Sequence, residues 1–394
     1  MPLGLYIAVP FCRTKCTYCN FASDVFSRAV FDNYIKRLRA EVEQSPENAG
    51  RLGAVLERSV DSIYFGGGTP TLLNVVQLEQ VFVTIRQNFQ LVKEAEITVE
   101  CAPGTLCDEI LEALIRSGVN RVSFGVQSFI DQEAASVGRL HKRQTVMDDI
   151  ARLRAAGITN INVDLIAGLP HQTRESWQES LDQLISTGVP HASVYMLEVD
   201  EDSRLGRELI AGGQKYHAHF VPDEDLTADL YEVACDRLNV AGIVQYEISN
   251  FARLGFESKH NLKYWTRQPY LGFGVDAHSM FQTGEREAVR FSNSDSLERY
   301  LACEPSSATR VDSQMALEER LFLGLRLNRG IDLNDLSARF PEFFPQQRAT
   351  IQELVHDGLL EQNGSNVRLT RRGRLLSNEV FERFICEPAR NAEV

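Results

Sequence analysis

Short β-rich segments alternate with amphipathic helical stretches from Leu3 to about Leu197. The sequence predicts strands over Leu5–Val9, Ser62–Phe65, Glu96–Glu100, Arg121–Phe124, Asn160–Ile166 and Ala192–Leu197. It predicts helices over Phe31–Glu43, Val75–Phe89, Asp108–Ser117, Thr145–Ala156 and Arg174–Thr187. Strands that alternate with helices favour a parallel sheet with right-handed crossovers. Six such units would form a partial (β/α)6 barrel, in place of a closed eightfold barrel.

Polar and glycine-rich residues lie at or just after the ends of the predicted strands. They are Phe11–Cys19, Gly66–Pro70, Glu100, Gln127 and Gly168–Pro170. Binding sites of α/β folds gather at the carboxyl ends of parallel strands. We therefore expect all of these residues to share one rim of the barrel.

Cys12, Cys16 and Cys19 form a C-x3-C-x2-C motif in the first of these rim segments. One short loop with this spacing can bind three corners of a cubane iron–sulfur cluster and leave the last iron open to a small molecule. Ferredoxin motifs supply a fourth cysteine, and none lies nearby here. Zinc and disulfides are the alternatives, but structural zinc prefers four ligands and an odd trio suits neither. The motif therefore predicts a three-cysteine cluster.

The composition indicates a large protein of a reducing compartment. A chain of 394 residues with 43% hydrophobic content suggests two or three domains. The other cysteines are scattered, which favours free thiols over a disulfide scaffold: Cys101, Cys107, Cys235, Cys303 and Cys386. The net charge of −13 disfavours nucleic-acid binding. Neither a signal peptide nor an apolar segment of membrane-spanning length is evident, so we expect a cytoplasmic protein, with peripheral membrane contact left open.

The sequence changes character after residue 200. We expect residues 1–200 to form the barrel, 201–295 a mixed extension, 296–310 a linker and 311–394 a small winged-helix-like domain. A helix is predicted over Asp223–Val240, whereas Tyr246–Phe291 is aromatic and glycine-rich without a helical period. The last domain is predicted from three helices and a hairpin, over Gln314–Leu327, Leu333–Phe340, Gln346–Asp357, Leu359–Gln362 and Asn366–Leu369. Its arginines invite a DNA-binding hypothesis, but fold alone does not give function.

The cysteine motif, the Gly66–Pro70 loop and the β/α alternation resemble the radical S-adenosylmethionine (SAM) superfamily. The resemblance implies a [4Fe–4S] cluster on the three cysteines, a free iron that binds the amino and carboxylate groups of SAM, and an electron donor for the cluster. The cofactor then supplies the radical chemistry. More narrowly, four segments resemble the oxygen-independent coproporphyrinogen dehydrogenase group: Leu5–Cys12, Gly66–Thr71, Gly125–Phe129 and Asp164–Pro170.

Two positions separate the branches of this group. The dehydrogenases carry another cysteine two residues after the third, where this chain has Phe21. The HemW-type haem-chaperone branch carries an H-N-x-x-Y-W motif, present here as His260–Trp265. The resemblance therefore implies a chaperone of porphyrin metabolism that carries haem as cargo to apoproteins and lacks dehydrogenase activity. The alternatives are an oxygen-independent coproporphyrinogen III dehydrogenase and a radical SAM enzyme with another substrate.

By resemblance, nine residues contact SAM: Tyr6, Tyr18, Gly67, Gly68, Thr69, Glu100, Gln127, Arg139 and Asp164. Glycines after a strand let a ligand approach the backbone, although they also form tight turns. Carboxylate and amide oxygens accept hydrogen bonds from hydroxyl or ammonium groups, and a guanidinium fits the SAM carboxylate. The simpler interpretations are a solvated charge for Glu100, a surface ion pair for Arg139, and packing for the two tyrosines.

The same resemblance assigns haem binding to the H-N-x-x-Y-W motif, through His260, Asn261, Tyr264 and Trp265. Neutral imidazole is a common ligand of haem iron, and the two aromatic rings could pack against a porphyrin face. His278 is a second candidate ligand. The alternative is a buried aromatic cluster that includes Tyr270 and Phe273.

Overall fold

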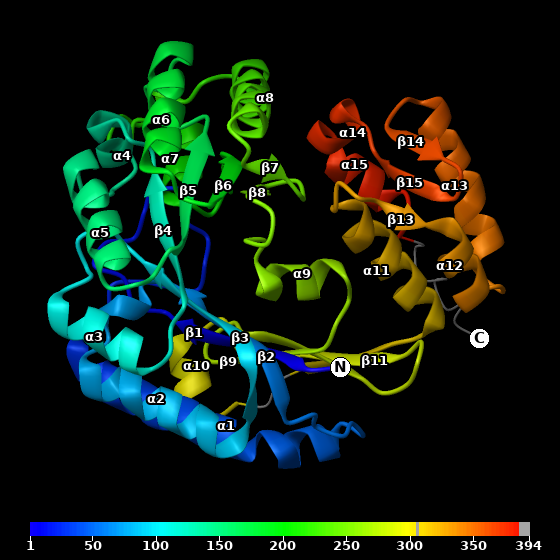
Figure 1. Ribbon diagram of the computed structural model, residues 1–394, viewed down its shortest axis with the longest axis horizontal. Coiled ribbons are helices and arrows are strands. Elements are labelled where there is room, and N and C mark those ends of the chain that lie inside the picture. Colours follow the sequence, from blue (N-terminus) through cyan, green and yellow to red (C-terminus); the bar gives the residue numbers. More distant parts are fainter. Residues whose placement is uncertain (305–306, 386–394) are drawn as a thin grey trace.

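The computed structural model describes residues 1–304 and 307–385, so Cys386 and the other residues of 386–394 lie outside the described residues. Six parallel strands lie side by side in chain order and form the expected partial barrel (Figure 1). Their bounds are β1 (Leu3–Val9), β2 (Ser59–Gly67), β3 (Gln90–Cys101), β4 (Arg121–Gln127), β5 (Asn160–Ala167) and β6 (His191–Met196). Each lies where the sequence predicts a strand.

The crossover helices pack against the outer face of these strands (Figure 1). They are α1 (Phe31–Arg51), α2 (Val75–Asn88), α3 (Asp108–Arg116), α4 (Asp131–Ser136), α5 (Arg143–Ala155) and α6 (Arg174–Thr187). Short 3₁₀ turns lie at Arg28–Val30, Pro70–Leu72 and Ala218–Phe220. Capping boxes fix the first turns of α2 and α6, where the Asn74 and Thr173 side chains accept from backbone N–H groups.

The two faces of the parallel strands differ in chemistry because side chains alternate along a strand. Apolar residues such as Ile7, Ile63 and Val163 point outward into the main hydrophobic core beneath the helices. The alternate positions carry polar side chains on the inner face, such as Tyr64, Glu100 and Asp164. A parallel sheet covered on both sides by helices is usually apolar on both faces. The polar inner face therefore marks this barrel as the wall of a binding site.

The extension continues the same sheet on both edges, so that within the described residues it has 12 strands. Added elements are α7 (Arg204–Ala211), α8 (Glu224–Val240), β7 (Val244–Gln245), β8 (Asn250–Ala252), α9 (Lys259–Trp265), β9 (Tyr270–Phe273), β10 (His278–Gln282), β11 (Ala288–Ser292), α10 (Leu297–Leu301) and β12 (Ser307–Val311). Strand β9 pairs with β1 in parallel, and β10–β12 follow it antiparallel. The expected linker, 296–310, thus contains a helix and an edge strand.

The C-terminal domain has the expected three helices and hairpin, with its own hydrophobic core. It contains α11 (Ser313–Leu325), β13 (Ile331–Asp332), α12 (Leu333–Arg339), α13 (Phe344–His356), β14 (Leu360–Asn363), β15 (Asn366–Leu369), α14 (Arg371–Leu375) and α15 (Ser377–Glu382). Helix α9 lies between β2 and α11 and so bridges the barrel and this domain (Figure 1). Among the described residues, none of the helices has the length and apolarity that crossing a membrane requires.

Candidate functional site

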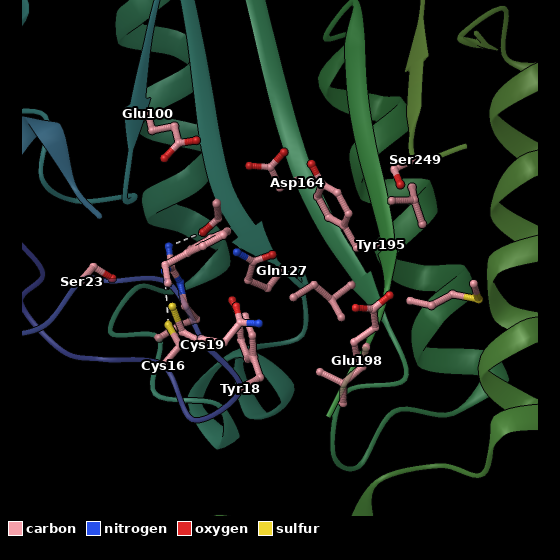
Figure 2. Close-up of a pocket in the computed structure, with 18 of the residues that line it drawn as sticks. Cys16, Tyr18, Cys19, Ser23, Glu100, Gln127, Asp164, Tyr195, Glu198 and Ser249 are labelled. Carbon is pink, nitrogen blue, oxygen red and sulfur yellow. Dashed lines mark hydrogen bonds between the residues drawn. The ribbon is translucent and has the colours of Figure 1, made fainter. Parts of the chain in front are cut away.

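A cavity of about 530 Å³ opens at the carboxyl ends of the barrel strands. All three motif cysteines line it, together with Gly67, Gly68, Thr69, Glu100, Gln127, Arg139 and Asp164. Figure 2 shows Glu100, Gln127 and Asp164 on the strand side of this space, with Cys16, Cys19 and Tyr18 facing them from the loop after β1. The structure therefore brings together almost all the residues that we expected around the cluster and SAM.

The cysteine loop is held at both ends by backbone hydrogen bonds. Cys12 N–H donates to the Asp24 carbonyl at 3.0 Å, and Thr17 N–H donates to the Val137 carbonyl at 3.2 Å. Beneath the loop, the Phe11 ring stacks on Phe31 with 3.7 Å between centroids. These contacts fix the path of the loop between β1 and the turn after α4.

The three thiols suit a cluster better than a single metal ion. Cys12, Cys16 and Cys19 are free. Across residues 1–304 and 307–385, no group of three or more His, Cys, Asp or Glu side chains is close enough to hold one ion. A cubane is wider than one ion and takes each thiolate on a different iron. Burial raises the pKa of the Cys12 and Cys19 thiols, so binding to iron has to displace their protons.

The glycine loop after β2 supports the cysteine loop as well as lining the cavity. A Cβ atom on Gly68 would lie 2.7 Å from the Val9 carbonyl oxygen and 2.8 Å from that of Phe11. Thr69 N–H donates to the same Phe11 carbonyl at 2.8 Å. Gly67 has a φ of 94°, which glycine adopts without strain. The tight-turn interpretation and the ligand-contact interpretation are therefore compatible.

Arg139 does not form the surface ion pair that we considered. Its Nη1 donates to the Cys16 sulfur at 3.6 Å, and its Nη2 donates to the Gly125 carbonyl. Its Nε is buried without a partner among the described residues. A Cβ atom at Gly125 would lie 3.2 Å from Arg139 Nη2, so the glycine leaves room for the guanidinium. A positive charge beside the cysteine loop favours the ionised thiolate form of its cysteines over the thiol.

Gln127 combines two features that favour a ligand contact. Its φ of 70° is rare for a residue other than glycine, and strained backbone of this kind concentrates at functional sites. Its Oε1 is buried and has no hydrogen-bond partner within the described residues, although buried polar atoms are normally paired. A hydroxyl or amine donor in the cavity would satisfy this oxygen.

Glu100 is a half-buried residue that lines the cavity. Burial is the main cause that raises its pKa to about 7, and the nearby Asp164 carboxylate raises it further. Tyr64 donates a hydrogen bond of 2.8 Å to Glu100 Oε1, which opposes the shift. Glu100 is therefore held by Tyr64 in the wall of the cavity, in place of the exposed position that the simpler interpretation assumed. A carboxyl with this pKa changes its charge near neutral pH.

Asp164 lies in a buried polar network that the sequence analysis missed. Its oxygens accept from Ser123 Oγ at 3.3 Å and Asn162 Nδ2 at 2.7 Å. Burial raises the pKa of Asp164, and the hydroxyl of Ser193 and other donors oppose that shift. The signal was present in the sequence, because these residues occupy alternate positions of the predicted strands.

The two expected tyrosines have different surroundings. Tyr18 lines the cavity beside the cysteines (Figure 2), and burial raises its pKa. Tyr6 instead lies deeper in the barrel, outside the cavity lining, where its ring stacks on Tyr64 with 6.1 Å between centroids. Tyr6 thus supports the residue that holds Glu100.

The far side of the cavity contains residues that the sequence analysis did not single out. Figure 2 shows Tyr195, Glu198 and Ser249 on the side away from Cys16 and Cys19. The C-terminal domain completes this side with Arg326, Leu375, Ser377 and Asn378. They come from segments far apart in the chain, and only the tertiary fold brings them together.

The expected haem-binding motif lies at the opposite end of the barrel interior from the cysteines. His260 lies near the N-terminal half of β2, with its Nδ1 3.1 Å from Ser62 Oγ. Its Nε2 lies 2.8 Å from Tyr264 Oη of the same helix. Only 1% of His260 is exposed, and burial lowers its pKa to about 3. The ring is therefore neutral, but both nitrogens are occupied. Ligation of haem iron by His260 requires one of these hydrogen bonds to break.

The other motif residues extend from the barrel interior toward the C-terminal domain. Tyr264 packs edge-on against Tyr270 at 4.6 Å, as the aromatic-cluster alternative expected. Trp265 lies under the guanidinium of Arg326, which lines the cavity. Asn261 is half-buried on α9, and His278 is exposed beside Asp276.

Known proteins match this chain over almost its whole length. The Radical SAM superfamily profile matches residues 6–184, and the HemN C-terminal domain profile matches residues 311–376. "Heme chaperone HemW" of Lactococcus lactis is 33% identical, with 98% of each chain covered. The protein of the same name from Bacillus subtilis is 35% identical, with 97% of this chain and 99% of the relative covered.

A solved structure shows the same architecture. It is titled "Coproporphyrinogen III oxidase (HemN) from Escherichia coli is a Radical SAM enzyme", and it superimposes with a TM-score of 0.81. The two chains share 25% sequence identity, over 97% of this chain and 90% of the other. Because the two relatives named above match almost the whole chain, this chain belongs to the HemW family within the radical SAM superfamily.

Proposed function

We propose that this chain is a haem chaperone, which binds haem and passes it to apoproteins while holding SAM and an iron–sulfur cluster. The observation that carries the proposal is the similarity over 97–98% of the chain to two relatives named as haem chaperones. The similarity includes the region of the H-N-x-x-Y-W motif and the C-terminal domain, so it extends well beyond the cluster site.

Membership of the radical SAM superfamily implies a [4Fe–4S] cluster and SAM. In our proposal Cys12, Cys16 and Cys19 hold the cluster. Gly67, Gly68 and Thr69 lie beside the methionyl part of SAM, and Tyr18, Glu100, Gln127, Arg139 and Asp164 complete its site. The unpaired Gln127 oxygen and the free thiols support these assignments. Tyr6 contributes by packing against Tyr64.

The proposal also includes partners and a compartment. A reducible cluster needs an electron donor, and the cargo needs haem-accepting apoproteins. The described cysteines are free thiols, which is typical of the cytoplasm. We therefore place the protein there.

Anaerobic reconstitution followed by haem titration tests the proposal. We expect a Soret band that saturates at one haem per chain, and transfer of that haem to an added apo-haem protein. A triple Cys12, Cys16 and Cys19→Ser variant should lose the cluster and serves to show whether haem binding depends on it. A chain that binds no haem in either state would contradict the proposal.

The haem ligand is tested separately with two variants that touch the same ring. If His260 binds iron, His260→Ala should shift the Soret band or lose it. Ser62→Ala removes a hydrogen bond to that ring but keeps the imidazole, so it should retain the band. An unchanged titration in His260→Ala would exclude His260 and direct attention to His278.

A second candidate function is oxidative decarboxylation of coproporphyrinogen III, which the close superposition on the Escherichia coli structure favours. Phe21 stands where the dehydrogenases carry a further cysteine, and it lines the cavity. An anaerobic assay with reduced cluster, SAM and coproporphyrinogen decides between the two. Formation of protoporphyrinogen would replace the chaperone proposal with the enzymatic one.

A further inference from the structure

Arg326 stands out among the cationic residues of the cavity. It follows α11 and reaches the side of the cavity away from the cysteines, next to Glu247 and the segment that carries Ser249. The two other cations of the lining, Lys15 and Arg139, are held by the cysteine loop and its surroundings. Lys15 donates to the carbonyls of Phe21 and Ser23, whereas Arg139 donates to Cys16 and Gly125.

The guanidinium of Arg326 is positioned but incompletely paired. Its Cζ lies 4.3 Å from the ring centroid of Trp265, a cation–π contact that restricts the side chain. Its nearest carboxylate, Glu247, is 3.8 Å away, which is too long for a hydrogen bond. Arg326 Nε is buried and has no hydrogen-bond partner among the described residues. The side chain of Arg326 is 24% exposed and lines the cavity, so its guanidinium can take a further acceptor there.

The cavity that Arg326 lines suits a flat apolar ligand with acidic substituents. Apolar residues cover much of it: Ile166, Val194, Met196, Leu197, Ile248 and Leu375. Haem combines a flat apolar ring with two propionate carboxylates. A guanidinium binds a carboxylate through two parallel hydrogen bonds, and this pairing is stronger away from water.

We propose that Arg326, held against Trp265, is the anchor for a haem propionate at the C-terminal side of the cavity. The inference rests on the proposed chaperone function and adds the site of the cargo. It also gives Trp265 of the H-N-x-x-Y-W motif a positioning role that needs no contact between His260 and iron. Haem would lie with its propionate edge toward α11, on the far side of the cavity from the cysteine loop.

Two ligands test the anchor without any change to the protein. Haem and haem dimethyl ester have the same ring and iron, but the ester has no carboxylates. Soret titration of the anaerobically reconstituted full chain should show affinity for haem about 10- to 100-fold above that for the diester, since hydrogen bonds to charged groups are worth more than neutral ones. Equal affinity for both ligands would contradict the anchor, whereas no binding of either would contradict the chaperone function itself.

Variants then assign the preference to one residue. Arg326→Gln should remove the preference for haem and leave diester affinity within about threefold, and Arg326→Lys should restore part of it. Arg326→Gln removes the cation next to the buried Glu247 carboxylate. A Glu247→Gln/Arg326→Gln double variant removes both charges, and the same two titrations are repeated with it. Arg329→Gln, an exposed arginine three residues away, should change neither titration.

Titration with SAM shows whether Arg326 binds the haem propionate or the carboxylate of SAM. SAM also carries a carboxylate, so Arg326→Gln is titrated with SAM in parallel. An unchanged SAM affinity with a lost haem preference supports the assignment. A retained haem preference, or a loss that falls on SAM instead, would overturn it.

Discussion

The barrel interior is organised around one carboxyl group, Glu100. Tyr64 donates to it, Tyr6 stacks on Tyr64, and the His260 ring lies 5.4 Å from the Tyr64 ring. A column of rings thus connects α9 at the base of the barrel with a carboxylate in the cavity. This arrangement suggests that part of the H-N-x-x-Y-W motif positions the cavity residues, whatever its role toward haem.

We expect SAM binding to depend on the ionisation of Glu100. Its pKa of about 7 means that the carboxylate forms as the pH rises from 6 to 8. An anionic group attracts the cationic sulfonium of SAM, so the dissociation constant should fall by up to about tenfold over this range. Equilibrium dialysis of SAM against the reconstituted protein measures it.

Glu100→Gln should bind SAM weakly at every pH and lose the pH dependence, while Glu112→Gln, on the exposed face of α3, should retain the pH dependence.

The stability of the unaltered protein should fall over the pH range in which its affinity for SAM rises. The folded state takes up a proton between the ordinary carboxyl pKa of 4.5 and about 7, so stability falls as the pH rises through that window. A dissociation constant that is the same at pH 6 and pH 8 would contradict this role.

Tyr64→Phe provides a second test at this site. Removing the phenol hydroxyl deletes a hydrogen bond that stabilises the ionised form of Glu100. The midpoint of the pH dependence of SAM binding should therefore move to higher pH, while the ring stacking is kept. A midpoint at the same pH would show that Tyr64 has no influence on the carboxyl group.

At the scale of elements, two loops depend on each other: the glycine loop after β2 and the cysteine loop after β1. Gly68→Ala would place a methyl group against the backbone of Val9 and Phe11, which cannot yield without moving the cysteines. We expect it to lower the iron content after reconstitution and to cost about 1–3 kcal/mol of stability.

Gly50→Ala is the matched control, because a Cβ atom there meets nothing within 4 Å. It lies in α1, where alanine is the better helix former, so stability should rise by up to about 1 kcal/mol with no change in iron. Full iron content in Gly68→Ala would show that the cysteine loop adapts independently of the glycine loop.

The elements themselves were largely predictable from sequence. The six strands, five of the crossover helices and the predicted C-terminal helices and hairpin lie close to the predicted positions, because each has a clear period and turn residues at its ends, although α1 continues to Arg51. Helix α4 of the barrel was not predicted, since it has only six residues. Helix α9 was missed, since seven residues are too short for a period to be visible. Strand β9 was missed as part of the barrel sheet, since its partner β1 is distant in the chain.

The site was predictable only in part. Residues at the carboxyl ends of strands, such as Glu100 and Gln127, could be found because strand ends meet at one rim. Tyr64 and Ser123 belong to the inner face and required the alternation along each strand to be interpreted as polar lining. Arg326 gave no local signal at all, since its place beside Trp265 depends on how α11 meets α9.

At the scale of the molecule, a buried charge cluster connects the C-terminal domain to the extension. Glu319 of α11 binds Arg267, which follows α9, at 2.6 Å, and Arg290 of β11 at 3.1 Å. The Glu319 and Arg267 side chains are only 5% and 1% exposed. Glu319→Gln would leave the buried guanidinium of Arg267 without its counter-charge. We expect the free energy of unfolding, measured with urea, to fall by about 3–5 kcal/mol.

A second ion pair between the same two regions gives the control for this prediction. Glu342 and Arg286 also connect the two regions, but their side chains are 58% and 39% exposed. Glu342→Gln should cost at most about 1 kcal/mol, since water screens the pair. Equal losses in the two variants would mean that burial does not determine the strength of this connection.

The claim on which the whole account depends is that the cysteine loop holds a cluster with an iron open to SAM. Electron paramagnetic resonance of the reduced, anaerobically reconstituted protein measures this directly. We predict the spectrum of a reduced [4Fe–4S] cluster that changes on addition of SAM and is absent from the triple cysteine→serine variant. A spectrum that SAM leaves unchanged, or a cluster that survives loss of all three cysteines, would contradict the account.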